Sequence, residues 1–121
     1  NYEKDEEAPD LRKRTKEFAL RIIAMCDRLP KSQVGRVLGN QILRSGTSVG
    51  ANYREAFRAR SKAEFISKCG DSQKELEETI YWMELLTESG TVTPAKMKLL
   101  FRESEELMSI FSAIIKSSRR R

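Results

Sequence analysis

The sequence predicts an all-α protein, an antiparallel up-down-up-down four-helix bundle. Apolar residues recur every three or four positions through four long stretches, which is the spacing of one helical face. The three prolines, Pro9, Pro30 and Pro94, fall between these stretches, and the connections are too short for long crossovers. The chain has 121 residues, 39% of them apolar, which suits one folded core. We expect the bundle over residues 11–115, an acidic arm over 1–10, and a basic tail over 116–121 that is disordered beyond the last helix.

The first helix is expected over residues 11–29. Asp10 is suited to cap its N-terminus, because an aspartate side chain accepts hydrogen bonds from free backbone N–H groups. Pro30 ends the helix, since the residue before a proline avoids the helical conformation. Its buried face is predicted to consist of Leu11, Thr15, Phe18, Ile22, Met25 and Leu29.

The third and fourth helices have clear start and stop signals. Ser61 and Glu64 have the spacing of a capping box, so a helix starts there, and Gly90 closes it. Thr93 then caps a last helix with Pro94 in its first position. Their buried faces are predicted to be Phe65, Cys69, Ser72, Leu76, Ile80, Met83 and Leu86, then Met97, Leu100, Ser104, Leu107, Phe111 and Ile114.

The second helix, over residues 32–58, contains four glycines: Gly35, Gly39, Gly46 and Gly50. At about 100° per residue they form one narrow stripe beside the apolar face. The arginines of this helix fall on the side opposite the apolar face. Such sorting favours a helix over a phosphate loop, which would need a Gly-Lys-Ser/Thr ending after a strand. The apolar face comprises Val34, Leu38, Ile42, Val49, Tyr53, Ala56 and Phe57.

Each helical glycine costs roughly 1 kcal/mol relative to alanine, so the stripe is expected to meet another helix at close range. Two alternatives stay open: close packing against a helix of the same bundle, or an oligomer interface. Polar residues border the core on the same helix, at Gln41, Ser45, Ser48 and Asn52. Buried amides need partners. Pairing across helices is expected between Glu55, Glu75 or Glu78 and Arg44, Lys68 or Lys74.

The net charge of +5 is unevenly distributed. Residues 11–60 carry twelve basic and three acidic side chains, whereas residues 61–115 carry six basic and ten acidic ones. If the first two helices are adjacent, their arginines form one continuous cationic face that fits phosphate backbones. A solvated surface with weak local ion pairs is the alternative. The candidate nucleic-acid-binding residues are Arg14, Arg21, Arg28, Arg36, Arg44, Arg54, Arg58 and Arg60.

Other residue types argue against enzymes and metal proteins. The chain has no histidine, which removes the usual general base and the Glu-x-x-His pattern of di-iron bundles. Its two cysteines alone do not make a zinc site. We expect no enzymatic activity, metal, cofactor or small-molecule substrate. No apolar run approaches the roughly 18 residues that span a membrane, and no signal peptide is visible, so we expect a cytoplasmic protein.

Two segments, "QILRSGTSVGANYREA" over 41–56 and "SKAEFISKCGDSQKELEETIYWMELL" over 61–86, carry a family resemblance. The chain resembles the four-helix-bundle proteins encoded by intervening sequences in bacterial 23S rRNA genes. The match includes Phe65 as well as polar residues. The family-motif polar residues are Gln41, Arg44, Ser45, Ser48, Asn52, Glu55, Lys68 and Glu75.

The resemblance implies a ring, typically a homopentamer, and no established enzymatic activity. It also implies kinship with the accessory variability protein of diversity-generating retroelements, a pentameric basic barrel that binds nucleic acid and a reverse transcriptase. A ring lets the acidic half of one subunit meet the basic half of the next. We expect a non-enzymatic ring that binds structured RNA or an RNA–DNA hybrid. The alternative is a protein-binding adaptor without nucleic-acid contact.

Overall fold

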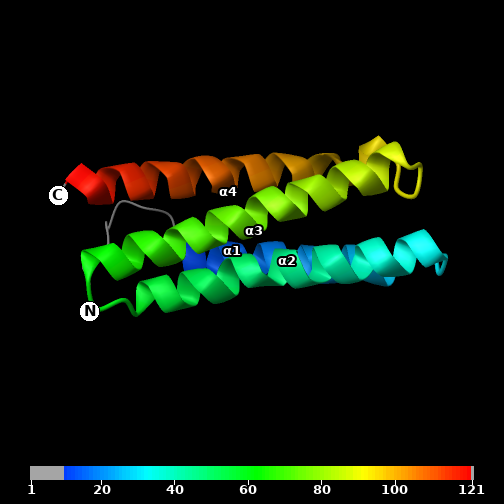
Figure 1. Cartoon of the computed structure of the whole chain (residues 1–121). Helices are drawn as coiled ribbons and strands as arrows, with labels where there is room; N and C mark the ends of the chain where they lie inside the picture. Colours follow the sequence, from blue (N-terminus) through cyan, green and yellow to red (C-terminus); the bar gives the residue numbers. More distant parts are fainter. Residues whose placement is uncertain (1–9, 121) are drawn as a thin grey trace.

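In the computed structural model, which describes residues 10–120, the chain is a bundle of four α-helices (Figure 1). They are α1 (Leu11–Asp27), α2 (Gln33–Phe57), α3 (Lys62–Glu88) and α4 (Pro94–Arg120). Successive helices run in opposite directions, so the all-α bundle predicted from the sequence is confirmed. The contact between α2 and α3 is the most extensive, and α1 meets α4 least.

The predicted caps of α1 and α3 bind the first turns of these helices, with one difference at Glu64. The side chain of Asp10 accepts hydrogen bonds from the N–H groups of Arg12 and Lys13, and Ser61 accepts one from the N–H of Glu64. The Glu64 carboxylate accepts from the N–H of Arg60, one residue earlier than in a standard capping box. Gly90 follows α3 with a φ of 79°, a conformation that side chains rarely adopt. These contacts fix the ends of the helices independently of the core.

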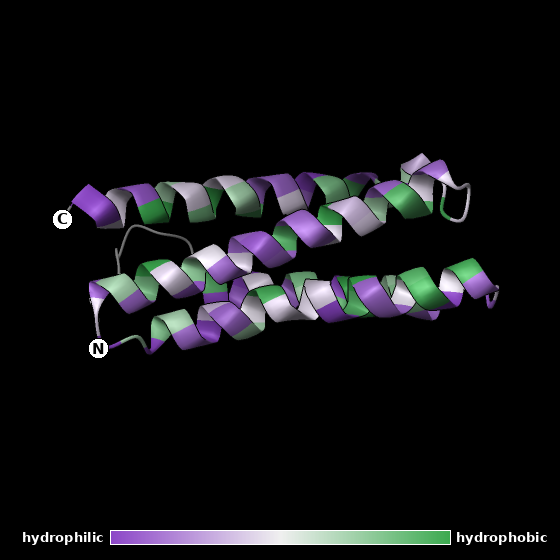
Figure 2. Cartoon of the chain, in the orientation of Figure 1, coloured by the Kyte–Doolittle hydropathy of each residue, from purple (hydrophilic) through white to green (hydrophobic). Residues whose placement is uncertain are grey.

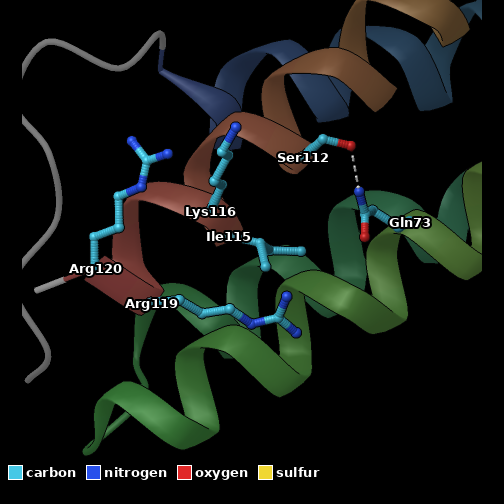
Figure 3. Close-up of a pocket in the computed structure, with 6 residues that line it drawn as sticks. All are labelled: Gln73, Ser112, Ile115, Lys116, Arg119 and Arg120. Atoms are coloured by element: carbon cyan, nitrogen blue, oxygen red, sulfur yellow. Dashed lines mark hydrogen bonds between the residues drawn. The ribbon is translucent and has the colours of Figure 1, made fainter.

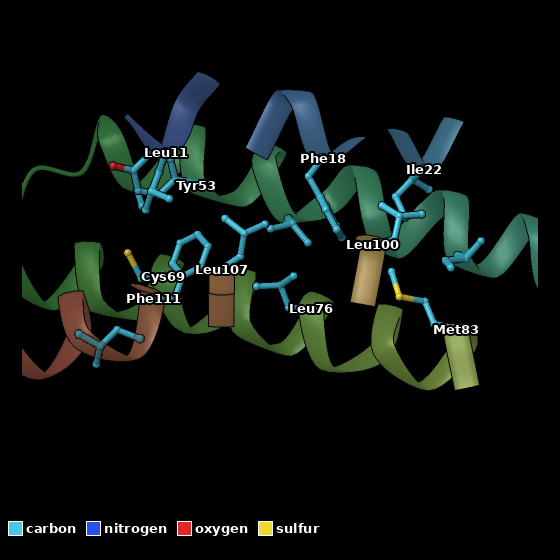
Figure 4. Packing of buried hydrophobic residues seen from close by; sticks show 14 of the residues in the cluster. Leu11, Phe18, Ile22, Tyr53, Cys69, Leu76, Met83, Leu100, Leu107 and Phe111 are labelled. Atoms are coloured by element: carbon cyan, nitrogen blue, oxygen red, sulfur yellow. The ribbon is translucent and has the colours of Figure 1, made fainter. Parts of the chain in front are cut away.

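The core lies along the axis of the bundle and draws on all four helices (Figure 4). Phe18 and Ile22 from α1, Leu76 from α3 and Phe111 from α4 are almost fully buried. The Tyr53 ring of α2 meets the Phe111 ring edge-on, with 5.7 Å between the centroids. Figure 2 shows apolar and polar residues alternating along each helix, as expected where one face is buried.

Most residues predicted to be buried are buried or half-buried, and two positions shift by one residue. In α3 it is Thr79 that is fully buried and Ile80 that is half-buried; in α4 Ile115 is buried and Ile114 is half-buried. Val34 is the clear exception, because its side chain is exposed. Ser45 of α2 bonds to Thr79 of α3, and extending that antiparallel register places Val34 beside the loop after α3. No helix covers it there.

The last helix is longer than predicted. We expected residues 116–121 to be disordered, but α4 continues through Arg120. Ser118 follows Ile115 by three residues on the same helical face, and both are buried. The Lys62 ammonium also donates a hydrogen bond to the Arg119 carbonyl at 3.5 Å. These contacts account for the extra helical turn. Most of the predicted acidic arm, residues 1–9, lies outside the described part of the chain.

Candidate functional site

The glycine stripe of α2 lies against α1 and the loop that follows α1 in the same chain. A Cβ atom added to Gly46 would be 2.9 Å from Cγ1 of Ile22, and one on Gly39 would be 3.0 Å from Cδ1 of Leu29. The two helices therefore approach more closely than side chains would allow. Of the two alternatives, close packing within the bundle is what the structure shows.

The stripe is filled along its whole length. A Cβ on Gly50 would be 3.0 Å from Oγ1 of Thr15. At the other end, a Cβ on Gly35 would be 2.1 Å from the carbonyl oxygen of Pro30. Contacts within the chain therefore account for all four glycines, and an additional contact with another subunit stays a prediction.

A second side of α2, which carries Ser45, meets α3 through small hydroxyl side chains. The hydroxyl groups of Ser45 and Thr79 are 2.8 Å apart, and both residues are fully buried. Ser72 donates a hydrogen bond to the carbonyl of Val49 at 2.9 Å. The hydroxyls of Ser45, Ser72 and Thr79 thus each have a partner, as burial of a polar group requires. The small size of these side chains lets α2 and α3 pack closely.

The other polar residues predicted to border the core of α2, Gln41, Ser48 and Asn52, are half-buried. Asn52 donates to the carbonyl of Ser48, and Ser48 in turn donates to the carbonyl of Arg44. Both bonds stay within α2, so they do not fix the register between helices.

Three of the predicted charge pairings occur. Arg44 binds Glu75 at 3.3 Å and also pairs with Glu78, both on α3. Lys68 of α3 binds Glu55 of α2 at 2.7 Å. The pKa of Lys68 is raised, mainly by its hydrogen bond to Glu55. The family-motif charges Arg44, Glu55, Lys68 and Glu75 therefore tie α2 to α3.

A further ion pair was not predicted. Arg14 of α1 binds Glu103 of α4 through two nitrogens, at 2.9 and 3.0 Å, and also contacts Glu106. The hydrogen bond that Arg14 donates to Glu103 is the largest cause that raises the pKa of Arg14. Since the partners are distant in sequence, only the fold reveals them. The acidic and basic halves thus meet within one chain, at Arg14 and at Arg44.

The arginine rows of α1 and α2 do not form the single face that we expected. Arg14 lies on the α4 side of α1, because its partners are on α4. Arg21 and Arg28 follow at intervals of seven, almost two helical turns, so they lie on that side as well. The helical wheel places Arg36 and Arg54 on the edge of α2 that borders α1. The exposed surface of α1 therefore separates the two rows.

Arg12 of α1 also contacts α2, and it is not among the arginines predicted from the sequence to form the site. Its guanidinium carbon lies 4.0 Å from the centroid of the Phe57 ring of α2, a cation–π contact. This places Arg12 on the α2 side of α1. The signal in the sequence was only a basic residue near the start of a helix, which has no particular meaning before the helices are paired.

Six of the eight candidate arginines have no carboxylate partner within residues 10–120, and all six are exposed. Arg36 donates to a backbone carbonyl, that of Lys31. Arg14 and Arg44 are held by carboxylates instead. The unpaired set is Arg21, Arg28, Arg36, Arg54, Arg58 and Arg60.

Within residues 10–120, the cysteine and acidic side chains are not arranged as a reactive centre. Burial raises the pKa of Cys69 to about 12 and that of Cys26 to about 11, so neither thiol is activated. Within the described residues, acidic and cysteine side chains form no cluster of metal-binding size. None of the four helices combines the length and apolarity needed to cross a bilayer.

Comparisons with known proteins give a family and similar solved structures. The model of the 23S rRNA-intervening sequence protein family matches residues 8–113. A crystal structure of a protein of unknown function from the S23 ribosomal protein family of Bacteroides thetaiotaomicron is 40% identical, with a TM-score of 0.83. The match covers 88% of this chain and 95% of that chain. No curated protein matches the sequence.

Proposed function

The chain belongs to the 23S rRNA-intervening sequence protein family, and we propose that it is a non-enzymatic, ring-forming protein that binds nucleic acid through the arginines of α1 and α2. The ligand would be structured RNA or an RNA–DNA hybrid. The proposal includes a homopentamer and kinship with the accessory variability protein, with a reverse transcriptase as the partner.

The observation that carries the proposal is the set of exposed arginines without carboxylate partners. Arg21, Arg28, Arg36, Arg54 and Arg58 project from two adjacent helices of one bundle. Cations that are not neutralised within the chain attract phosphates and release counterions on binding. Arg14 and Arg44 contribute less, because their carboxylate partners already neutralise them. Because these arginines would contact phosphates, we expect the protein to recognise the shape and charge of a nucleic acid and to show little base-sequence specificity.

Exposed apolar side chains support assembly. Leu20 is 55% exposed and Ile23 is 40% exposed on α1, and Leu43 is exposed on α2. Large apolar side chains gathered on a surface favour association with another protein surface. In a ring, repetition of the arginine surface adds avidity for a long polyanion.

The direct test measures binding of a labelled RNA hairpin and an RNA–DNA hybrid by fluorescence anisotropy at two salt concentrations. The double variant Arg54→Glu/Arg58→Glu reverses two unpaired charges on α2. The control, Lys98→Glu/Arg102→Glu, makes the same charge change at exposed positions of α4. We expect at least about a tenfold loss for the α2 variant only, since each charged hydrogen bond is worth roughly 1.5–3 kcal/mol. Equal losses in both variants would contradict the mapped surface.

The same exposed apolar residues favour a second candidate function, that of a protein-binding adaptor. In that case the cationic surface would dock an acidic protein such as a polymerase. A partner retained in a pull-down after nuclease treatment would support the adaptor. Salt-sensitive binding of purified RNA would support the first proposal.

A further inference from the structure

A groove of about 490 Å³ lies between α3 and α4, close to the end of α4 (Figure 3). Its floor is apolar at Ile115 and polar where Gln73 donates a hydrogen bond to Ser112 at 2.8 Å. The lining also includes three cations, Lys116, Arg119 and Arg120. None of these residues belongs to the arginine surface of α1 and α2.

The helical end of α4 holds these cations in place. Ile115 and Ser118 are buried, so the residues between and after them face outward. In Figure 3 the Arg119 side chain extends toward α3, while Lys116 and Arg120 rise from the other side of α4. Lys62 of α3 donates to the Arg119 carbonyl and adds a fourth positive charge beside the groove.

Little negative charge offsets this cluster. The sequence of α4 contains no aspartate or glutamate after Glu106. Within residues 10–120, none of the four cations forms an ion pair. Glu64, the acidic residue nearest to Lys62 in sequence, accepts a hydrogen bond from the N–H of Arg60. The cluster therefore stays cationic around a groove that holds polar donors.

Helix dipoles favour the cations at the end of α4. Cations in the last turn of α4 stabilise it, typically by about 0.3–1 kcal/mol each. This explains Arg119 and Arg120. Lys62, however, lies in the first turn of α3, where the dipole disfavours a positive charge. It donates instead to a carbonyl in the last turn of α4, where the dipole of that helix favours a positive charge.

We propose that this groove is a phosphate-binding site. The arginine guanidinium groups present paired donors that match phosphate oxygens, and Lys116 adds a point charge. The Ser112 oxygen accepts from Gln73, which leaves its own proton free to be donated to a ligand. The volume is within the range of sites that hold small ligands. The phosphate comes either from a free polyphosphorylated molecule or from a nucleic-acid backbone.

The test uses inorganic tripolyphosphate as the probe and calorimetric titration of the full chain. The groove variant is Lys116→Glu/Arg120→Glu. Its matched control, Lys98→Glu/Arg102→Glu, has the same residue types and spacing on the same face of α4, about five helical turns earlier. All four positions are exposed, so both variants are expected to fold, which circular dichroism checks. A third variant, Arg54→Glu/Arg58→Glu, removes charge from α2.

We expect tripolyphosphate to bind the unmodified protein and both control variants, and to bind the groove variant at least about tenfold more weakly. Equal weakening by Lys98→Glu/Arg102→Glu, or no binding by the unmodified protein, would overturn the site. Retained binding by the α2 variant separates this site from the proposed function, which can fail on its own. A parallel loss of RNA affinity in the groove variant would assign the phosphate to nucleic acid. Unchanged RNA affinity would assign it to a free phosphorylated molecule.

Discussion

Gly46 and Gly70 both lie inside long helices, yet their surroundings differ. A Cβ on Gly46 would meet three atoms of Ile22 between 2.9 and 3.3 Å, whereas a Cβ on Gly70 would meet nothing within 4 Å. Ile22 is branched at Cβ and has little freedom to move aside. The same residue type therefore serves close packing at one position, while the structure gives no packing reason for it at the other.

We predict opposite effects of alanine at these two sites. Gly46→Ala should lower the unfolding free energy by about 1–2 kcal/mol, because overpacking outweighs the gain in helix propensity. Gly70→Ala should raise it by up to about 1 kcal/mol. Urea denaturation of both variants measures the difference. A Gly46→Ala protein as stable as the unmodified one would show that α1 moves away without penalty.

The buried thiol of Cys69 predicts a loss of stability at high pH. Burial raises its pKa from 9.0 to about 12, so above pH 9 the unfolded chain releases a proton that the folded chain keeps. Unfolding then becomes easier as pH rises, by up to about 1.4 kcal/mol per pH unit from this group. Below pH 9 the thiol is protonated in both states and contributes no pH dependence.

The measurement is urea denaturation between pH 8 and 10.5 for the unmodified protein and for Cys69→Ala. Other groups titrate in this range, so the difference between the two slopes isolates the thiol. The slope should be shallower in Cys69→Ala. Identical slopes would contradict the raised pKa.

At the scale of elements, the four interhelical contacts are held in different ways. The α1–α2 contact relies on glycines, and the α2–α3 contact on small hydroxyl residues and the Arg44 and Lys68 ion pairs. The α1–α4 contact is the least extensive. There Arg14 and its two glutamates join the first helix to the last. A charged contact therefore matters most where packing is sparsest.

Arg14→Gln is predicted to destabilise the protein by about 1 kcal/mol, because Glu103 loses a two-point partner and is left close to Glu106. Glu103→Gln should have a similar effect, and the double variant should cost less than the sum of the two. Lys16→Gln, at an exposed position of the same helix, is the control. Additive effects in thermal unfolding would rule out a coupling between Arg14 and Glu103.

At the scale of the whole molecule, charge is organised in three surfaces. The arginine row of α1 borders α4, the row of α2 borders α1, and the end of α4 carries the cations of the phosphate groove. The apolar residues Leu20 and Ile23 lie between the two arginine rows on α1. Assembly and nucleic-acid binding are thus proposed for adjoining parts of α1 and α2.

The proposed ring predicts a solution mass near five times the chain mass of 13.9 kDa, measured by light scattering. Leu20→Glu should shift the protein toward smaller species, because it places a charge among the exposed apolar residues of α1. Leu99→Glu, at an exposed apolar position of α4, is the matched control. A monomer at all concentrations would contradict the ring, and equal effects of the two variants would contradict its location.

The helices, their capping residues and most of the buried positions could be predicted from the sequence, because periodicity, caps and prolines act over a few neighbouring residues. The sequence also indicated that glycines, core and arginines sort onto separate sides of α2. Its pattern named Arg44, Glu75 and Glu78 as possible partners across helices. These features depend on the geometry of one helix, which is the same in every fold.

The neighbours of each side of a helix could be identified only from the tertiary structure. It placed α1 over the glycines, paired Arg14 with Glu103, put Arg12 on Phe57 and drew the C-terminal cations to α3. The sequence could not show these contacts, because they join residues far apart along the chain. Their position depends on which helices pack together and in which rotation. That choice is made by the shape of the whole core.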